Sequence, residues 1–439
     1  MKIAVIGSGI TGLGTAYALS DNHEVKLFEK AERFGGHSNT VDLNLRGKIV
    51  PVDTGFIVYN NMNYPNLASL FENLQVKTKW SDMSFGFSQN EGQLEYACDS
   101  LNKLFSQRKN IFNKNFITGL IEILRFNREA PNALVGDDLK NMSFGEYLFN
   151  QKHGKWFKEN FILPMGSAIW STPASQILNF PASSFITFFK NHDLLVGMSK
   201  SQRWRTVDGG SRVYVNKILR KLGSSAISNC NITSVERTSK GVRVSFSDRN
   251  AELFDQVIFC THAPETMKLL SGKTDEEINI LKCFKTSKNR VVLHSDEKLM
   301  PKRRKVWSSW NFISAQVGSE KSKKDSVTYW MNRLQGINKE YPIFVSLNPI
   351  SIPENRKTYE NFNYNHPVFD KKSFNAQSSC DLIQGVGGVW YAGAWLGYGF
   401  HEDGLTSGLR VANALNVRPC WQKNYMPFKN ASSLLTAAE

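Results

Sequence analysis

The first 29 residues most constrain what this chain can fold into. A run of β-branched and aliphatic residues, KIAVI at 2–6, leads directly into the glycine-rich turn GSGITG at 7–12. Residues 13–19, LGTAYAL, have the composition of a helix, and a second apolar run at 24–28 ends in Glu29. Strand, glycine turn, helix and strand in this order predict a βαβ unit that binds a dinucleotide.

Each glycine of the turn has a physical task. Gly7 permits the tight turn, Gly9 lets the backbone approach a pyrophosphate, and Gly12 lets the helix pack closely on the strand. Free N–H groups at the helix start and the positive end of its dipole favour phosphate. Glu29 stands where an acid hydrogen-bonds the ribose of an adenosine. The predicted cofactor residues in the turn are Gly7, Gly9, Ile10, Thr11 and Gly12.

Length and composition indicate a folded protein with two domains, or one domain with a large insertion. The chain has 439 residues, of which 41% are hydrophobic, so it can bury a sizeable core. Its formal charge of +15 favours anionic partners. The basic residues are spread along the chain without a helix-turn-helix or stacking pattern, so nucleic acid is not expected as a partner. Two basic clusters, at 298–305 and 321–324, are interpreted as solvated loops.

The six cysteines are far apart and form no CxxC pair, so the sequence predicts neither a disulfide framework nor a metal site. The N-terminus already reads as a strand rather than a signal peptide, and no window has the roughly 18 apolar residues that a membrane span needs. A cytoplasmic protein is expected. A basic amphipathic stretch at 101–128 leaves two interpretations open: a helix that covers a core, or peripheral contact with the inner face of a membrane.

The residues after Glu29 favour FAD over NAD. The segment EKAERFGGH at 29–37 is similar to the flavin-containing amine oxidoreductase family, which includes monoamine and polyamine oxidases, protoporphyrinogen oxidases and carotenoid desaturases. Members carry a similar Arg-x-Gly-Gly step where the chain runs beneath FAD. An ordinary glycine turn between strands is the alternative. The resemblance implies FAD as cofactor, with contacts from Glu29, Lys30, Arg33, Gly35, Gly36 and His37.

The same resemblance divides the chain into a cofactor domain and a substrate domain. The segment VPVDTGF at 50–56 is similar to the part of the family that approaches the flavin, and Val235 matches a valine near the adenine. We expect an α/β fold in which a discontinuous, three-layer, Rossmann-like FAD-binding domain carries an inserted α+β substrate domain. The cofactor domain is expected at 1–60, 205–285 and 385–420, and the substrate domain at 61–204 and 286–384.

The segment GVWYAGAWLGYGFHEDGLTSGLRVANAL at 388–415 resembles the last FAD motif of the family. It predicts a strand through Ala392 that ends at Gly393, and a helix over 405–415 whose N-terminus points at the flavin. Relatives place an acid after the strand-ending glycine to bind the ribityl chain, whereas here Ala394 stands there. The acids that follow are candidates for that contact or for helix caps. The predicted cofactor residues of this segment are Gly393, Glu402, Asp403 and Leu405.

Three residues are candidates for catalysis. Amine oxidases of the family use a lysine near flavin N5, and the matching run NRVVLH at 289–294 offers Arg290, which cannot readily lose its proton. Tyr398 and His401 are expected to border the flavin, and a histidine with an ordinary pKa near about 6.5 can move a proton at neutral pH. A histidine that only hydrogen-bonds within the turn is the alternative for His401.

Together these features predict an FAD-dependent oxidoreductase that takes hydride from a hydrophobic substrate. Aromatic residues are dense in both inserted stretches, and the segments GFHEDGL at 399–405 and YWMNRLQ at 329–335 resemble a bacterial branch of the family linked with fatty-acyl modification. An unsaturated or branched fatty-acyl lipid is therefore the expected substrate. A flavin amine oxidase and a redox-silent, flavin-bound lipid-binding protein are the alternatives. The sequence does not identify the electron acceptor.

Overall fold

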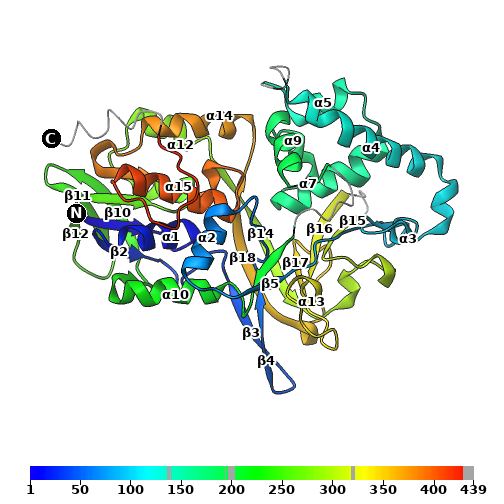
Figure 1. The fold of residues 1–439 in the computed structure, drawn as a ribbon, viewed down its shortest axis with the longest axis horizontal. Coiled ribbons are helices and arrows are strands. Elements are labelled where there is room, and N and C mark those ends of the chain that lie inside the picture. Colours follow the sequence, from blue (N-terminus) through cyan, green and yellow to red (C-terminus); the bar gives the residue numbers. More distant parts are fainter. Residues whose placement is uncertain (136–138, 140, 193, 196–202, 318–321, 429–439) are drawn as a thin grey trace.

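The computed structural model describes residues 1–135, 139, 141–192, 194–195, 203–317 and 322–428. Its two halves lie side by side along the longest axis (Figure 1). One half contains the first and the last described segments of the chain, and the other is formed by two long stretches between them. Among the helices of the described residues, none is long and apolar enough to cross a membrane.

A parallel sheet forms the centre of the first half. Its strand order is β19-β13-β1-β2-β9. The strands are β1 (Lys2–Ile6), β2 (Glu24–Phe28), β9 (Ala226–Ile227), β13 (Gln256–Phe259) and β19 (Val389–Tyr391). All four neighbouring pairs are parallel, with Val5 opposite both Leu27 and Ile258. The short apolar runs of the sequence are buried strands because both faces of the sheet are covered.

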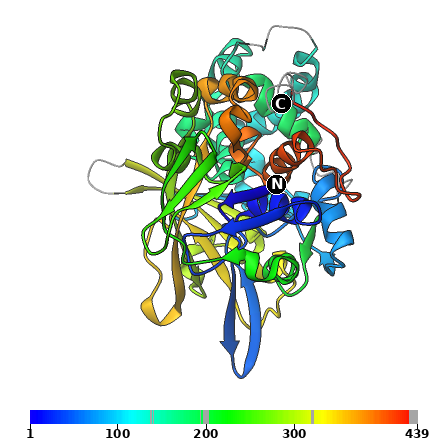
Figure 2. The ribbon, with the colours of Figure 1, turned by 90° about the vertical axis from the view of Figure 1, so that its left-hand side faces the viewer.

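Two layers cover this sheet, as Figure 2 shows edge-on. On one face, Val5, Leu27 and Ile258 pack against helices; on the other, Ile6 and Phe259 pack against a small antiparallel sheet and further helices. The first layer contains α1 (Ile10–Leu19), α2 (Pro65–Asn73), α10 (Arg212–Leu222) and α15 (His401–Ala414). The second contains β10 (Ile232–Thr238), β11 (Gly241–Phe246), β12 (Glu252–Phe254), α11 (Ala263–Leu269), α12 (Asp275–Leu281) and α14 (Lys371–Ser379). The expected three-layer, Rossmann-like fold is confirmed.

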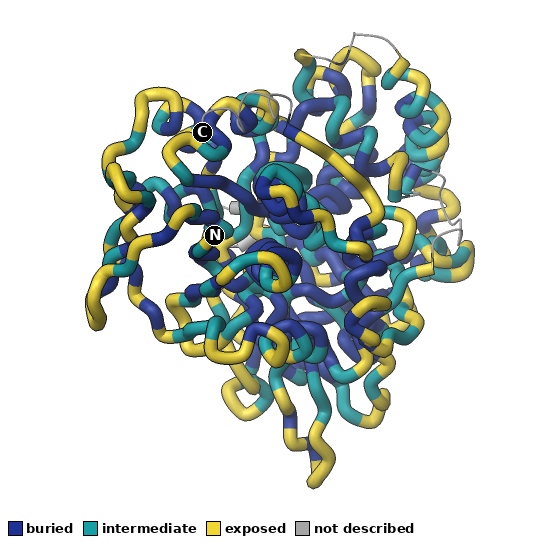
Figure 3. Tube along the Cα trace, turned by 60° about the vertical axis from the view of Figure 1, so that its left-hand side comes forward, coloured by how far each residue is buried: buried dark blue, intermediate teal, exposed yellow. Residues whose placement is uncertain are grey.

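A seven-stranded sheet dominates the second half, in the order β18-β14-β17-β16-β15-β6-β7. Its strands are β6 (Phe85–Gln89), β7 (Leu94–Ala97), β14 (Lys285–His294), β15 (Trp310–Val317), β16 (Ser322–Trp330), β17 (Phe344–Leu347) and β18 (Thr358–Val368). Strand β6 runs parallel to β15, with Phe87 opposite Phe312. Both inserted stretches therefore build one sheet, and Figure 3 shows buried segments through the interior of both halves.

Helices complete the second half. They are α3 (Leu101–Leu104), α4 (Lys114–Ala133), α5 (Phe144–Asn150), α6 (Lys155–Phe157), α7 (Leu163–Trp170), α8 (Ala174–Ile177), α9 (Ala182–Asn191) and α13 (Met331–Leu334). Two antiparallel strand pairs lie between the halves: the hairpin of β3 (Thr40–Leu45) with β4 (Lys48–Asp53), and the pair of β5 (Thr78–Trp80) with β8 (Arg205–Val207). The basic stretch at 101–128 is not one helix. It is broken into α3, a 3-10 helix at Arg108–Phe112 and α4.

Candidate functional site

A cavity of about 2040 Å³ is lined from both halves of the molecule. Ordinary small-molecule pockets measure about 300–1,000 Å³, so this cavity has room for a cofactor and a substrate together. One end lies at the carboxyl edge of the parallel sheet, against Gly9 and Glu29, and the other reaches Leu120 of α4 and Leu347 of β17.

The glycine turn after β1 forms a cradle open to this cavity. A Cβ atom placed on Gly9 would meet no protein atom within 4 Å, whereas one on Gly12 would lie 1.8 Å from the carbonyl oxygen of Gly7. Helix α1 has no side-chain cap at Gly9 and no acid in its first turn. Its first N–H groups, near Ile10 and Thr11, therefore remain available to an anion.

The carboxylate of Glu29 lies at the end of β2, on the wall of the cavity. One of its oxygens accepts hydrogen bonds from the backbone N–H and the hydroxyl of Ser8, at 3.0 and 2.6 Å. The other accepts from the N–H of Ala31 at 2.9 Å. These bonds hold the carboxylate in one orientation beside the glycine turn, where a ribose is expected.

Arg33 stabilises the loop that contains Gly35 and Gly36. Its guanidinium donates to the carbonyl oxygens of Phe34, Gly36 and Ser38 at 2.8–3.1 Å. The sequence predicts Arg33 as a contact of FAD. Although Arg33 lines the cavity, these three hydrogen bonds use its donors to hold the backbone of the loop, with Gly36 packed against Gly9.

The closing helix α15 begins at His401, four residues before the expected start. The reason is a cap in which Asp403 accepts a hydrogen bond from the N–H of Phe400 at 2.8 Å. Burial raises the pKa of Asp403 to about 7. Glu402 accepts from the N–H groups of Asn66 and Leu67 at 3.0 and 2.9 Å, so it caps helix α2. Neither acid lines the cavity, whereas Gly393 and Ala394 do. We therefore assign the acids to capping.

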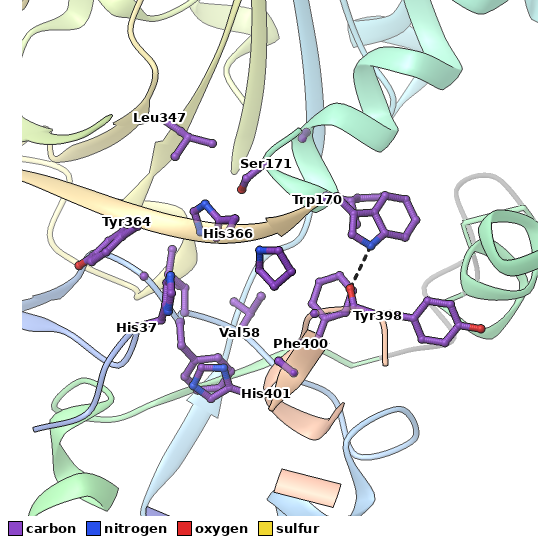
Figure 4. A pocket seen from close by; sticks show the side chains of 18 of the residues that line it. His37, Val58, Trp170, Ser171, Leu347, Tyr364, His366, Tyr398, Phe400 and His401 are labelled. Atoms are coloured by element: carbon purple, nitrogen blue, oxygen red, sulfur yellow. Dashed lines mark hydrogen bonds between the residues drawn. The ribbon is translucent and has the colours of Figure 1, made fainter. Parts of the chain in front are cut away.

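His401 and Tyr398 both lie on the cavity wall (Figure 4). The imidazole of His401 stacks on Phe56 with ring centroids 3.8 Å apart, and its Nε2 lies 3.0 Å from the hydroxyl of Ser38. Burial lowers the pKa of His401 to about 3, so this ring is neutral at neutral pH, contrary to the near-neutral pKa expected. The ring of Tyr398 points away from His401, towards Phe188 of α9.

The structure brings most of the predicted residues to the cavity and leaves others outside it. Those on its wall are Gly7, Gly9, Ile10, Thr11, Glu29, Lys30, Arg33, Gly36, His37, Gly393, Tyr398 and His401. Those outside it are Gly12, Gly35, Val235, Arg290, Glu402, Asp403 and Leu405. Val235 and Leu405 are core residues, and the segment that leads from β9 into β10 reaches the cavity through Cys230 and Ile232 instead.

Arg290 is exposed on β14, and its guanidinium donates to the side chain of Asn361 at 3.1 Å. Its backbone N–H starts a relay of amides that ends in the cavity. The backbone N–H of Arg290 donates to Oδ1 of Asn348 at 2.9 Å, which fixes the orientation of the Asn348 amide. The nitrogen of this amide donates in turn to Oδ1 of Asn289 at 2.7 Å. Asn289 then donates to Nδ1 of His366 at 2.8 Å. Neutral His366 consequently carries its proton on Nε2.

His366 belongs to a histidine cluster of which the sequence predicts only His37 as a site residue. The ring of His37 lies 5.1 Å from His366 and 6.3 Å from His262, between centroids. Nε2 of His37 is buried without a hydrogen-bond partner among the described residues. Burial is the main cause that lowers the pKa of all three histidines. Besides the Gly-Gly-His step that predicts His37, the sequence offered one signal for this cluster, which is the position of His262 three residues after the buried strand β13.

The part of the cavity that lies in the second half, which we call the apolar arm, is lined mainly by apolar side chains. Trp170 donates its indole N–H to the carbonyl of Tyr398 at 3.1 Å and so joins this arm to the closing segment (Figure 4). The acids on this part of the wall are matched: Asp82 pairs with Arg333 at 2.6 Å, and Asp99 pairs with Lys103 at 2.7 Å. Its apolar wall includes Val58, Leu104, Phe105, Leu120, Ile123, Met165, Ile169, Val291, Val345 and Leu347.

Comparisons with known proteins agree on one family. The family model of flavin-containing amine oxidoreductases matches residues 10–299. A Mycobacterium tuberculosis protein assigned as a flavin-containing monoamine oxidase, AofH, is 24% identical over 267 residues. That match covers 57% of this chain and 55% of the relative, so this chain spans about half the length of the curated relatives it matches.

Solved structures share the fold over nearly the whole chain. Putrescine oxidase bound to putrescine has a TM-score of 0.67 at 15% identity, and 95% of this chain and 99% of that chain are covered. A CLA-producing fatty acid isomerase from P. acnes has a TM-score of 0.68 at 14% identity, with the same coverage. At these identities the likeness concerns the fold.

The cavity fits the cofactor that such proteins contain, FAD. The open space beside Gly9, the uncapped start of α1 and the oriented Glu29 suit its adenosine diphosphate part. His37, whose buried Nε2 has no hydrogen-bond partner among the described residues, is on the wall of the same cavity. From the match over 10–299 and this fit we conclude that the chain belongs to the flavin-containing amine oxidoreductase family.

Proposed function

We propose that this protein is an FAD-dependent oxidoreductase whose substrate is an unsaturated or branched fatty-acyl lipid. The observation that carries the proposal is the apolar arm, which joins the cofactor cradle within one cavity. Bound FAD would supply a two-electron acceptor for hydride from a substrate C–H bond. The protein would bind the acyl chain, exclude water and orient the bond that breaks.

The chemistry of the wall favours a neutral chain over an amine. An amine reaches the cavity as a cation, and the nearby acids Asp82 and Asp99 already pair with Arg333 and Lys103. Arg290, which stands where amine oxidases place a lysine, is directed to the outside. The proposed role of His366 is to offer its Nε2–H to an uncharged acceptor on the substrate, because its other nitrogen is engaged by Asn289.

We also propose that residues 61–204 and 286–384 form one substrate-binding domain. Strands β6 and β7 come from the first stretch, and they extend the sheet that the second stretch begins. Two helices within these bounds lie with the cofactor domain instead: α2 packs on α15, and α14 packs on α12. The cavity would then be lined by residues of both domains.

Anaerobic mixing tests the proposed function. Oxidised holoenzyme would be mixed with a phospholipid bearing unsaturated acyl chains in detergent micelles, with the corresponding free acids, and with mono- and diamines. Loss of the yellow flavin absorbance with acyl lipids alone is expected, with dithionite as the control for a reducible flavin. Bleaching by amines, with peroxide release in air, would favour the amine oxidase alternative. No bleaching except by dithionite would favour the redox-silent alternative.

A further inference from the structure

The chain from α3 to α4 presents a row of large apolar side chains to solvent. These five residues, which we call the α3–α4 surface, are Phe112, Leu124, Leu101, Ile121 and Ile111, with exposed fractions of 89%, 69%, 66%, 60% and 48%. They lie at the end of the molecule farthest from the parallel sheet (Figure 1). Large exposed apolar side chains gathered on one part of the chain can mark an interaction surface.

The core does not account for this surface. Helix α4 buries a different set of residues, Phe116, Gly119, Phe126 and Ala130, against the rest of the second half. At Gly119 the packing is so close that a Cβ atom would lie 1.8 Å from Trp156. The helix therefore has one apolar side for the core and a second one that no described residue covers.

The α3–α4 surface is continuous with the cavity. Leu101 and Leu124 are exposed to solvent and also line the cavity, so they stand at one of its openings. Leu104 and Leu120 continue the apolar wall inwards from these two residues. An acyl chain that enters here would meet apolar side chains along the whole path.

The segment that carries the α3–α4 surface is rich in basic side chains. Residues 101–133 contain six basic and two acidic side chains. One of the acids, Glu129, pairs with Arg128 at 2.8 Å, while Lys109 and Lys114 are exposed and form no ion pair with a described residue. The basic cluster at 302–305 lies beside α3, because Lys305 donates to the side chain of Asn102 at 2.6 Å.

We propose that the α3–α4 surface docks on a bilayer that contains anionic phospholipid. The five apolar side chains insert among the acyl chains, and the surrounding lysines and arginines lie at the level of the phosphates. The opening between Leu101 and Leu124 then faces the hydrocarbon, and an acyl chain can enter without crossing water. The use of the opening for substrate rests on the proposed function, whereas docking itself does not.

Vesicle sedimentation tests the docking. Holoenzyme would be mixed with vesicles of phosphatidylcholine alone or with added phosphatidylglycerol. We expect binding to the anionic vesicles that weakens with salt. Each basic charge contributes about fivefold, so Lys109→Gln with Lys114→Gln lowers the affinity about 30-fold. Phe112→Ser and Ile121→Ser each lower it about tenfold by removing inserted apolar area. None of these four residues lines the cavity.

Matched controls change similar residues elsewhere. Ile352→Ser removes a side chain that is 71% exposed, and Lys240→Gln with Arg220→Gln removes two exposed charges from the cofactor half. All controls should bind vesicles like the wild type. Equal binding to neutral and anionic vesicles, or no loss in the Lys109, Lys114, Phe112 and Ile121 variants, contradicts the docking. So does a dimer in light scattering that Phe112→Ser dissociates, because the surface would then belong to a second copy.

The two proposals fail in different ways. If acyl lipids in micelles bleach the flavin but the protein stays in the supernatant with anionic vesicles, the docking is wrong and the proposed function stands. If the protein binds those vesicles through the α3–α4 surface but no acyl lipid bleaches the flavin, the docking stands and the substrate is wrong.

Discussion

Gly9 and Gly12 belong to one turn, but a side chain would have a different effect at each position. The space beside Gly9 is empty of protein, and the space beside Gly12 is filled by the carbonyl of Gly7. The sequence predicted both tasks, because the βαβ geometry is local and contained within about 30 residues. It could not predict His366, whose contact with His37 joins residues far apart in the chain.

The pair Gly9→Ala and Gly12→Ala separates ligand binding from folding. We expect Gly9→Ala to melt like the wild type without cofactor but to weaken FAD binding about tenfold, because its methyl group enters the cradle. Gly12→Ala should destabilise the apo-protein by about 3 kcal/mol, because its methyl group overlaps backbone. Urea unfolding and FAD titration measure the two effects. Equal loss of stability in both variants would contradict this division.

The partly buried imidazole of His401 should make the protein sensitive to acid. Its pKa is lowered from 6.5 to about 3 by burial, so its contribution to stability is complete above about pH 6.5 and is lost as the pH falls towards 3. When the pH is lowered from 7 to about 5, we expect the unfolding free energy of the wild type to fall by about 2 kcal/mol more than that of His401→Gln. Urea unfolding at each pH gives the comparison, and parallel profiles would show that His401 does not titrate in this way.

At the scale of elements, α15 shows where sequence patterns mislead. The acids at 402 and 403 read as ligands or as the cap of a helix that starts after them. In the structure, Asp403 lies in the first turn and caps its own helix, while Glu402 caps α2, more than 300 residues earlier in the chain. When the capping residue comes from another element, the sequence around the capped helix does not reveal it. The strands β6 and β7 were likewise not predictable as parts of the large sheet, because their partners come from the second stretch.

Glu402→Ala tests the link between α15 and α2. Helix α2 has no side-chain cap from Tyr64, so loss of the Glu402 carboxylate leaves the N–H groups of Asn66 and Leu67 without their acceptor. We expect a loss of about 1–2 kcal/mol in unfolding free energy. Glu72→Ala, at an exposed position of the same helix, is the control and should change stability by less than about 0.5 kcal/mol.

At the scale of the molecule, both halves are assembled from distant segments. The central strand β1 has β13 on one side and β2 on the other, and helices α1 and α15 pack together from opposite ends of the chain. The discontinuous cofactor fold was predictable because both terminal segments carry family motifs. The course of the inserted stretches was not, because their aromatic residues fit either a core or a cavity wall.

Removal of residues 385–439 should abolish flavin binding, and supplying them as a separate fragment should restore it. A fragment of residues 1–384 lacks β19 and α15, so we expect it to bind no FAD. Co-expression with residues 385–439 should restore a yellow complex, because the missing elements contribute whole packing faces to the sheet. Absorbance of the purified complex measures this. A 1–384 fragment that binds FAD with wild-type affinity would contradict the shared site.

The late position of β19 and α15 also has a consequence for synthesis. When the ribosome has made the glycine cradle, the strand edge and helix that complete its surroundings are still more than 300 residues from being translated. No nascent intermediate can close the cavity before β19 and α15 have been translated. Flavin incorporation must therefore wait for these two elements, and we expect its yield to depend on how long the unfinished chain is kept from aggregating.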